Sequence, residues 1–303
     1  MEVSPSLPSP VLQKPLLEPA EPAMLDREYN PRLAVPDLGR IFERWAREGA
    51  AARAQYHPRV DLAYGTHERE RLDYFPAVRA TPGTHPPLCV FIHGGYWRAC
   101  DKSDFSWVAT GLLQRGFAVA VIGYGRIPAS PLATLVTQAQ RAHAWLHAHA
   151  DELGFDRNRI VTAGHSAGGH LTAMMLATRW PEVDPSLPRL LVRGGLAISG
   201  LFELEPLRHA PFLRDDLQLD GPTAAQLSPA RLEPAAGTRL ITAVGAFESD
   251  AFKQQSRLLT DRWAGSFRRH IEIPDTHHYD VCDGFAHADS LLCMAVNELL
   301  DPD

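Results

Sequence analysis

The chain has 303 residues, with 30 Lys and Arg against 36 Asp and Glu, which gives a formal net charge of −6 at neutral pH. This acidic balance disfavours nucleic acids and anionic membrane surfaces as partners, and no apolar run is long enough to cross a bilayer. The four cysteines, Cys89, Cys100, Cys282 and Cys293, form no C-x-x-C pair, which is typical of a reduced, cytoplasmic chain without disulfides or zinc knuckles.

The N-terminal segment is rich in proline, with six prolines in the first 25 residues. Proline at this density interrupts helices and sheet ladders, so we predict a mobile tail over residues 1–25. Residues 26–303 are then predicted to form one domain. Removal of the first 23 residues is accordingly expected to leave activity intact.

Apolar periodicity predicts an amphipathic helix from Pro36 to about Ala54, after which strand-like and helical segments alternate. Strands are predicted at 60–64, 72–78, 88–93, 118–124, 160–164, 195–199, 240–244 and 270–273. Further helices are predicted at 105–114, 133–148, 168–179, 251–263 and 285–300. This alternation indicates an α/β fold with a mostly parallel sheet covered on both faces, and a small helical insertion at about 202–238.

The most specific motif is Gly164–Gly168, which reads G-H-S-A-G and lies between a predicted strand and a predicted helix. In this setting small flanking residues permit a strained turn that exposes the Ser166 hydroxyl as a nucleophile. The helix that follows directs its first amides at developing negative charge. The sequence therefore predicts a serine nucleophile in an α/β-hydrolase fold.

A second motif, His93–Trp97 (H-G-G-Y-W), follows the predicted strand at 88–93. Its glycine pair lets the backbone approach a substrate closely, as an oxyanion-binding loop requires. We expect Tyr96 and Trp97 at the mouth of the site, where they would pack on an aromatic substrate. The alternative for both rings is an ordinary place in the core.

A serine nucleophile also needs a base and an acid, and in this fold both follow the serine along the chain. His277 and His278 follow the last predicted strand, and either is suitable as the base, whereas His287 falls within a predicted helix. Glu248 and Asp250 follow the strand at 240–244, and spacing alone does not choose between them.

These motifs together resemble the kynurenine formamidase (arylformamidase) family of serine α/β-hydrolases. The similarity rests on H-G-G-Y-W at 93–97, G-H-S-A-G-G-H at 164–170 and H-H-Y-D at 277–280. It extends over about residues 26–300 and includes E-Y-N-P at 28–31 and T-R-W at 178–180. The resemblance therefore covers nearly the whole chain apart from the proline-rich segment.

The resemblance implies a role for each member of a catalytic triad. Ser166 is the nucleophile, His278 matches the base that precedes an aromatic–Asp pair, and Glu248 matches the acid. The family usually has Asp at the acid position, so Asp250 remains the alternative.

The resemblance also implies the rest of the site and the reaction. Amides of Gly95, Tyr96 and Ala167 would form the oxyanion hole, and Trp97 would contact the substrate. The expected substrate is an aryl N-formyl amide such as N-formylkynurenine, or alternatively a short-chain acyl aryl ester. This chemistry requires no metal or organic cofactor. A homodimer is compatible with the sequence, which does not specify the oligomeric state.

Overall fold

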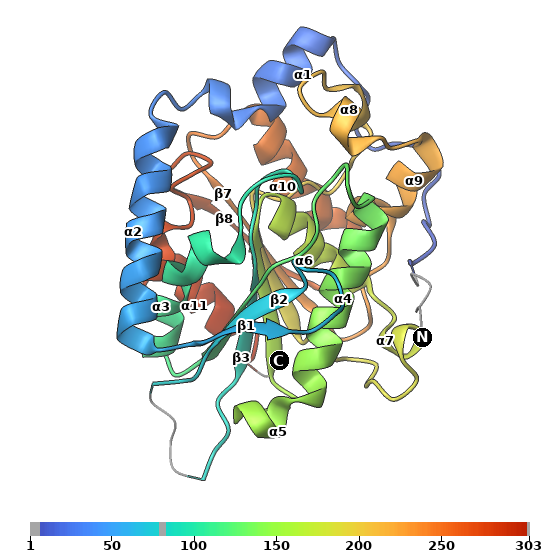
Figure 1. Ribbon diagram of the computed structural model, residues 1–303. Helices are drawn as coiled ribbons and strands as arrows, with labels where there is room; N and C mark the ends of the chain where they lie inside the picture. Colours follow the sequence, from blue (N-terminus) through green and yellow to red (C-terminus); the bar gives the residue numbers. More distant parts are fainter. Residues whose placement is uncertain (1–6, 79–82, 302–303) are drawn as a thin grey trace.

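A computed structural model describes residues 7–78 and 83–301, and within them the centre of the molecule is a twisted sheet (Figure 1). Its strands are β1 (Arg59–Ala63), β2 (Arg71–Phe75), β3 (Leu88–Ile92), β4 (Ala118–Ile122), β5 (Ile160–His165), β6 (Gly194–Ile198), β7 (Arg239–Gly245) and β8 (Phe267–Ile273). Their order across the sheet is β1-β2-β4-β3-β5-β6-β7-β8. β1 and β2 pair antiparallel, as do β2 and β4, and all other neighbours are parallel. The predicted mostly parallel α/β fold is confirmed.

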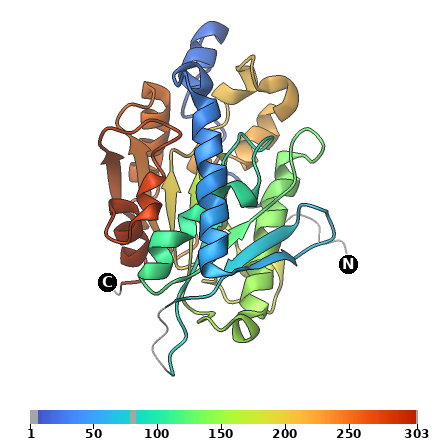
Figure 2. The same cartoon turned by 60° about the vertical axis from the view of Figure 1, so that its left-hand side comes forward.

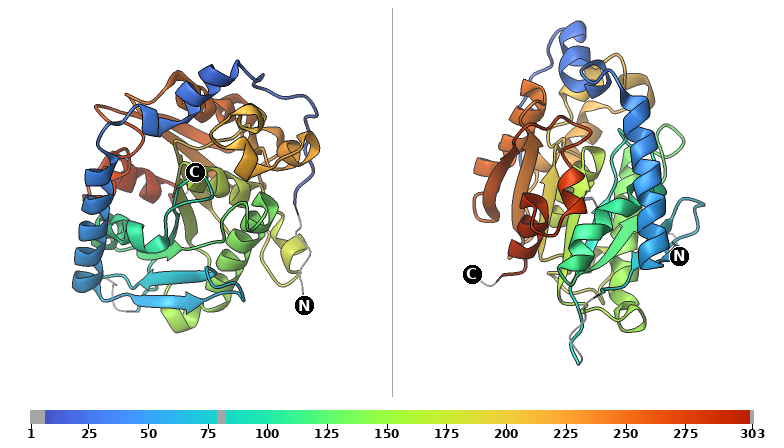
Figure 3. Two further views of the ribbon diagram at one scale, coloured as in Figure 1. Left: turned by 45° about the horizontal axis from the view of Figure 1, so that its top comes forward. Right: turned by 90° about the vertical axis from the view of Figure 1, so that its left-hand side faces the viewer.

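Helices cover both faces of the sheet, as Figures 1 and 3 show from different sides. The longer ones are α2 (Leu38–Tyr56), α4 (Leu132–Ala148), α6 (Ala167–Ala177) and α10 (Asp250–Arg262). Shorter ones are α1 (Pro22–Tyr29), α3 (Ala109–Gln114), α5 (Ala150–Leu153), α7 (Trp180–Val183), α8 (Arg214–Leu217), α9 (Gly221–Gln226) and α11 (Leu291–Glu298). Short 3₁₀ helices are η1 (Pro31–Leu33), η2 (Lys102–Val108), η3 (Pro206–His209), η4 (Pro229–Arg231) and η5 (Asp283–Ala286).

Two apolar clusters, one on each face of the sheet, hold these layers together. Along β3, Leu88, Val90 and Ile92 belong to one cluster, whereas Cys89 and Phe91 belong to the other. The alternation follows from the two-residue period of a strand, because successive side chains point to opposite faces. Helices α4, α6 and α10 contribute to the first cluster, and α2, α3 and α11 to the second. Figure 2 shows α2 running along the outside of that second layer.

The structure moves several predicted helix boundaries. The segment predicted at 105–114 is divided into η2 and α3, and the last helix begins at Leu291 rather than near residue 285. The Ser290 hydroxyl accepts a hydrogen bond from the Cys293 amide and so caps this later start. Helix α1 was not predicted, because its only two buried side chains, Leu25 and Tyr29, give a weak periodic signal.

The N-terminal segment packs against the domain over its described part. The Val11 amide donates to the Arg231 carbonyl at 2.8 Å, and the Leu16 amide donates to the Glu203 carboxylate at 3.0 Å. Leu17 is buried, and α1 crosses the boundary that the sequence places at residue 25. Proline does not prevent this packing, because residues 7–21 form no helix or strand and so need few of their own amides. Of the predicted mobile tail, residues 1–6 lie outside the described residues.

The interval at 202–238 forms the predicted helical insertion, with η3, α8, α9 and η4 in short succession. The insertion and α1 lie together at one end of the sheet in Figures 1 and 3, and the Phe212 amide donates to the Asp26 carboxylate at 3.1 Å. This end of the sheet holds the carboxyl ends of the parallel strands. The insertion and α1 therefore enclose the position expected for a ligand. Among the described helices, none combines the length and apolarity that a membrane span requires.

Candidate active site

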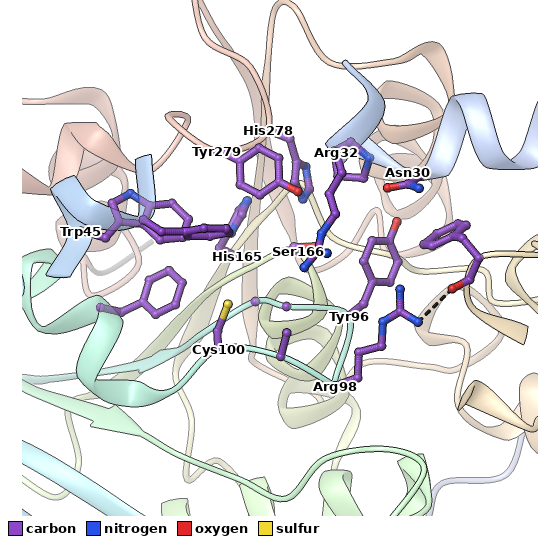
Figure 4. A pocket seen from close by; sticks show the side chains of 17 residues that line it. Asn30, Arg32, Trp45, Tyr96, Arg98, Cys100, His165, Ser166, His278 and Tyr279 are labelled. Carbon is purple, nitrogen blue, oxygen red and sulfur yellow. Dashed lines mark hydrogen bonds between the residues drawn. The ribbon is translucent and has the colours of Figure 1, made fainter. Parts of the chain in front are cut away.

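The predicted site residues meet at the carboxyl ends of the central strands. The loop after β3 carries Gly95, the turn after β5 carries Ser166, and the loop after β8 carries His278. All three line one cavity (Figure 4). Glycines and apolar or aromatic side chains make up much of its wall: Pro31, Phe42, Trp45, Gly94, Tyr96, Ala99, Phe105, Phe212 and Tyr279.

Ser166 lies in a strained turn between β5 and α6. Its backbone has φ 56° and ψ −116°, a conformation that L-residues rarely adopt. The Ser166 amide donates to the Ile198 carbonyl at 2.8 Å, and the Ser166 carbonyl accepts from His170 at 3.1 Å. These bonds hold the strained residue between strand and helix, as a nucleophile elbow requires.

The turn at Ser166 requires glycine at the two flanking positions, Gly164 and Gly168. A Cβ atom on Gly168 would lie 1.9 Å from the Ile92 carbonyl oxygen, and one on Gly164 would lie 2.2 Å from the Gly168 carbonyl oxygen. Both contacts are far inside van der Waals distance. The strand and helix can therefore approach closely only with glycine at both positions.

The loop after β3 has an unusual backbone, with positive φ at Gly95, Tyr96 and Trp97 in succession. The Gly95 carbonyl accepts hydrogen bonds from Arg98 and Ala99, at 3.0 and 2.9 Å, which closes the loop. Within the described residues, the amides of Gly95 and Tyr96 donate to no other protein group. They are available to a ligand in the cavity that both residues line.

Glu248 and His278 form a buried pair beside Ser166. His278 Nδ1 lies 2.6 Å from Glu248 Oε2, and both residues are more than nine-tenths buried. Glu248 Oε1 accepts two further hydrogen bonds, from the Ser199 hydroxyl at 2.5 Å and the Gly245 amide at 2.8 Å. The carboxylate is thus held on both oxygens, and its contact with Nδ1 leaves Nε2 of His278 as the nitrogen free for chemistry.

The other candidates for base and acid lie elsewhere. His277 is engaged with Asp280, whose carboxylate accepts from the His277 amide at 2.7 Å and lies 3.1 Å from its Nδ1. His287 is exposed at the end of η5, and Asp250 is exposed at the first turn of α10. None of these three lines the cavity with Ser166.

Trp97 does not lie where the sequence suggested. We predicted that it would contact the substrate, but its side chain is fully buried and it is not among the residues that line the cavity. Its ring packs edge-on against His170, with ring centroids 5.1 Å apart. The positive φ of Trp97 turns its side chain into the core behind the loop, whereas Tyr96 faces the cavity.

The sequence did not predict that the N-terminal region would cover the site. Asn30 and Arg32 lie over the cavity, and Phe42 and Trp45 on α2 form part of its wall (Figure 4). The Tyr29 carbonyl accepts a hydrogen bond from the Tyr96 hydroxyl, and the Glu28 carbonyl accepts one from Ser249 at 2.6 Å. The only sequence signal for this role was the family-like E-Y-N-P at 28–31.

Burial sets the ionisation of the surrounding groups. The ring centroid of His165 lies 4.7 Å from that of His278. Burial lowers the pKa of His165 well below its usual range, and a charge on His278 lowers this pKa further. His165 is therefore a neutral neighbour of His278. Burial also raises the pKa of Tyr279 to about 12, so its hydroxyl stays protonated. Among residues 7–78 and 83–301, no group of three or more His, Cys, Asp or Glu side chains is arranged to hold a metal ion.

Comparisons with known proteins agree with this architecture. The BD-FAE family model matches residues 74–187. Kynurenine formamidase of Danio rerio is 26% identical over 90% of this chain and 92% of its own length. Esterase LipC of Mycobacterium tuberculosis is 30% identical over 46% of this chain and 35% of its own length.

A crystal structure of a Silicibacter protein proposed to be a thioesterase superposes with a TM-score of 0.77. It is 32% identical, and the match covers 87% of this chain and 95% of that one. Kynurenine formamidases of three organisms match over three-quarters or more of this chain. Together with the geometry above, these similarities show that the chain is an α/β-hydrolase that is similar to kynurenine formamidases over most of its length.

Proposed function

We propose that this chain is a serine hydrolase that cleaves the formyl C–N bond of an aryl N-formyl amide, with N-formylkynurenine as its substrate. The products are then kynurenine and formate. The observation that carries the proposal is the buried His278–Glu248 pair, which lies beside a strained Ser166 at a cavity with aromatic walls. The similarity to kynurenine formamidases over about nine-tenths of the chain supports the choice of substrate.

In the first step, the Ser166 hydroxyl attacks the formyl carbon while Nε2 of His278 takes its proton. The carbonyl oxygen becomes an oxyanion that accepts hydrogen bonds from the amides of Gly95, Tyr96 and Ala167. Glu248, bound to Nδ1, holds the ring in position and stabilises the imidazolium.

In the second step, the C–N bond breaks as the imidazolium of His278 returns its proton to the leaving aryl amine. A formyl ester of Ser166 remains. Water then attacks this ester with His278 again acting as the base, and formate leaves as the serine recovers its proton. Each cycle consumes one water and leaves the protein unchanged.

The proposal is tested with purified protein, N-formylkynurenine and the Ser166→Ala variant. We expect the wild type to release formate and the variant to lose at least about a thousandfold in kcat, because the nucleophile is absent. A fluorophosphonate should label the wild type at Ser166 and leave the variant unlabelled. Turnover that survives unchanged in Ser166→Ala would contradict the mechanism.

The second candidate function is a carboxylesterase that acts on short-chain acyl aryl esters. It is favoured by the similarity to Esterase LipC. The same triad would serve, since an aryl oxide leaves more readily than an aryl amine. Side-by-side kcat/KM values for N-formylkynurenine and p-nitrophenyl acetate discriminate the two functions. Near-zero turnover of the formamide with rapid ester cleavage would favour the esterase.

A further inference from the structure

One cationic side chain points into the cavity without a carboxylate partner. Arg32 extends from η1 into the space above Ser166, and Figure 4 shows the side chain directed down from the N-terminal segment. The Arg32 guanidinium donates a hydrogen bond to the Tyr279 hydroxyl. Among the described residues, no carboxylate lies within ion-pair distance of its guanidinium.

The other arginine of the cavity makes an instructive contrast. Arg98 donates to the Phe212 carbonyl at 2.9 Å and to the Asp216 carboxylate at 2.5 Å, so its charge is neutralised within the protein. Arg98 thus joins the loop after β3 to the helical insertion. Arg32 forms no ion pair with another described residue, so it places an uncompensated positive charge at the mouth of the site.

The chain around Arg32 is fixed at several points. Tyr29 is buried, and its hydroxyl accepts a hydrogen bond from Gln255 on α10 at 3.3 Å. The Tyr29 carbonyl is bound by the Tyr96 hydroxyl, which belongs to the proposed oxyanion loop. The segment that carries Arg32 is therefore tied to the catalytic loops before any substrate binds, which reduces the entropy cost of binding.

We infer that Arg32 is a specificity-determining residue that binds a carboxylate on the leaving-group side of the substrate. This inference rests on the proposed hydrolase function. A planar guanidinium matches a carboxylate with two parallel hydrogen bonds, and a single unpaired cation matches a single negative charge. The Asn30 amide lies at the same rim of the cavity and supplies a further polar group (Figure 4).

The remaining walls of the cavity offer a place for the aromatic part of such a substrate. Phe42, Trp45 and Tyr279 form a connected aromatic cluster, with ring centroids 5.4 to 6.3 Å apart. An aromatic ring of the substrate would lie against this cluster while its carboxylate meets Arg32. The preferred substrates are therefore acylated aryl amines or phenols that carry a carboxylate on the aryl part, rather than neutral ones.

The test compares matched substrates that differ only by a carboxylate. One substrate pair is formanilide and its ring-carboxylated analogue, and the other is phenyl acetate and its ring-carboxylated analogue. Both pairs are measured with the wild type, Arg32→Gln, Arg32→Lys and Arg40→Gln. Arg40 is an exposed arginine on α2 outside the cavity and serves as the control. The readout is the ratio of kcat/KM for the carboxylated substrate to that for the neutral one.

We expect this ratio to fall at least about tenfold in Arg32→Gln, mainly through KM, because a charge-assisted hydrogen bond is lost. Arg32→Lys should retain part of the ratio, and Arg40→Gln should retain all of it. Added salt should lower the wild-type ratio, because Arg32 is exposed to solvent and its charge is screened. A ratio that is the same in wild type and Arg32→Gln would overturn the inference.

The two proposals fail in different ways. If the esters are cleaved and neither formanilide is, the proposed formamidase function is wrong. The ester pair then still tests whether Arg32 binds a substrate carboxylate. The Ser166→Ala variant allows a test without turnover, by titration with aniline and with its ring-carboxylated analogue. Equal dissociation constants for the two ligands would overturn the role of Arg32 whatever the reaction.

Discussion

The Ser199 hydroxyl lies 2.5 Å from Oε1 of Glu248, on the oxygen opposite the one that contacts His278. Ser199 follows β6, is fully buried and has a positive φ of 49°. Its strained backbone is held by a hydrogen bond from the Ser199 amide to the Ala243 carbonyl at 2.7 Å. The carboxylate that contacts His278 is therefore itself held by a residue that follows the neighbouring strand.

Ser199→Ala should lower kcat about tenfold with little change in KM, because Glu248 loses one of the bonds that fix it. Steady-state kinetics on the best substrate measures this effect. Ser256→Ala is the matched control, since Ser256 is equally buried on α10 but its hydroxyl has no partner among the described residues. Equal kcat losses in both variants would point to general destabilisation rather than to a positioning role.

Glu248→Gln should lower kcat by about a thousandfold or more, because an amide no longer stabilises the imidazolium of His278. Asp250→Asn should stay within about twofold of the wild type, since Asp250 is exposed and outside the cavity. Kinetics of both variants, with circular dichroism to verify folding, provides the measurement. A large loss in Asp250→Asn with an active Glu248→Gln would reverse the assignment of the acid.

Three buried histidines should make the fold sensitive to acid. Burial lowers the pKa values of His93, His143 and His170 from 6.5 to about 4 each. Below pH 6.5 the unfolded chain therefore binds protons that the folded chain does not, and stability is lost as pH falls from 6.5 toward 4. Each histidine should contribute a loss of about 1.4 kcal/mol per pH unit within that window.

Urea unfolding at pH 8, 7, 6 and 5 measures this dependence. His143→Leu should remove about a third of the slope attributed to the three histidines. His287→Gln is the control, because His287 is exposed and the substitution removes one imidazole without touching a buried site. A free energy of unfolding that is constant between pH 7 and pH 5 would contradict the prediction.

Deletion of residues 1–21 should lower the free energy of unfolding by about 1–3 kcal/mol, because the contacts of Val11, Leu16 and Leu17 with the domain are lost. The site begins at Asn30, so kcat/KM of the folded truncated protein should remain within about twofold of the wild type. Thermal unfolding and kinetics test the two parts separately. An unchanged melting temperature would show that these contacts do not stabilise the domain in solution.

Features that depend on residues close together in the chain were predictable from local patterns. Every predicted strand is present within a few residues of its expected place, because continuous apolar runs between helical segments leave few other arrangements. The strained turn at Ser166 was also foreseeable, since G-H-S-A-G between a strand and a helix encodes it locally.

Features that depend on residues far apart in the chain became visible only in the folded molecule. Spacing did not show which of Glu248 and Asp250 contacts His278, because that contact depends on how the loop after β7 meets the loop after β8. The same holds for Trp97, which a positive φ turns into the core. Arg32 reaches the cavity only because its segment is tied to Tyr96 and Ser249, far along the chain. Such contacts form only on folding, and local sequence patterns do not carry them.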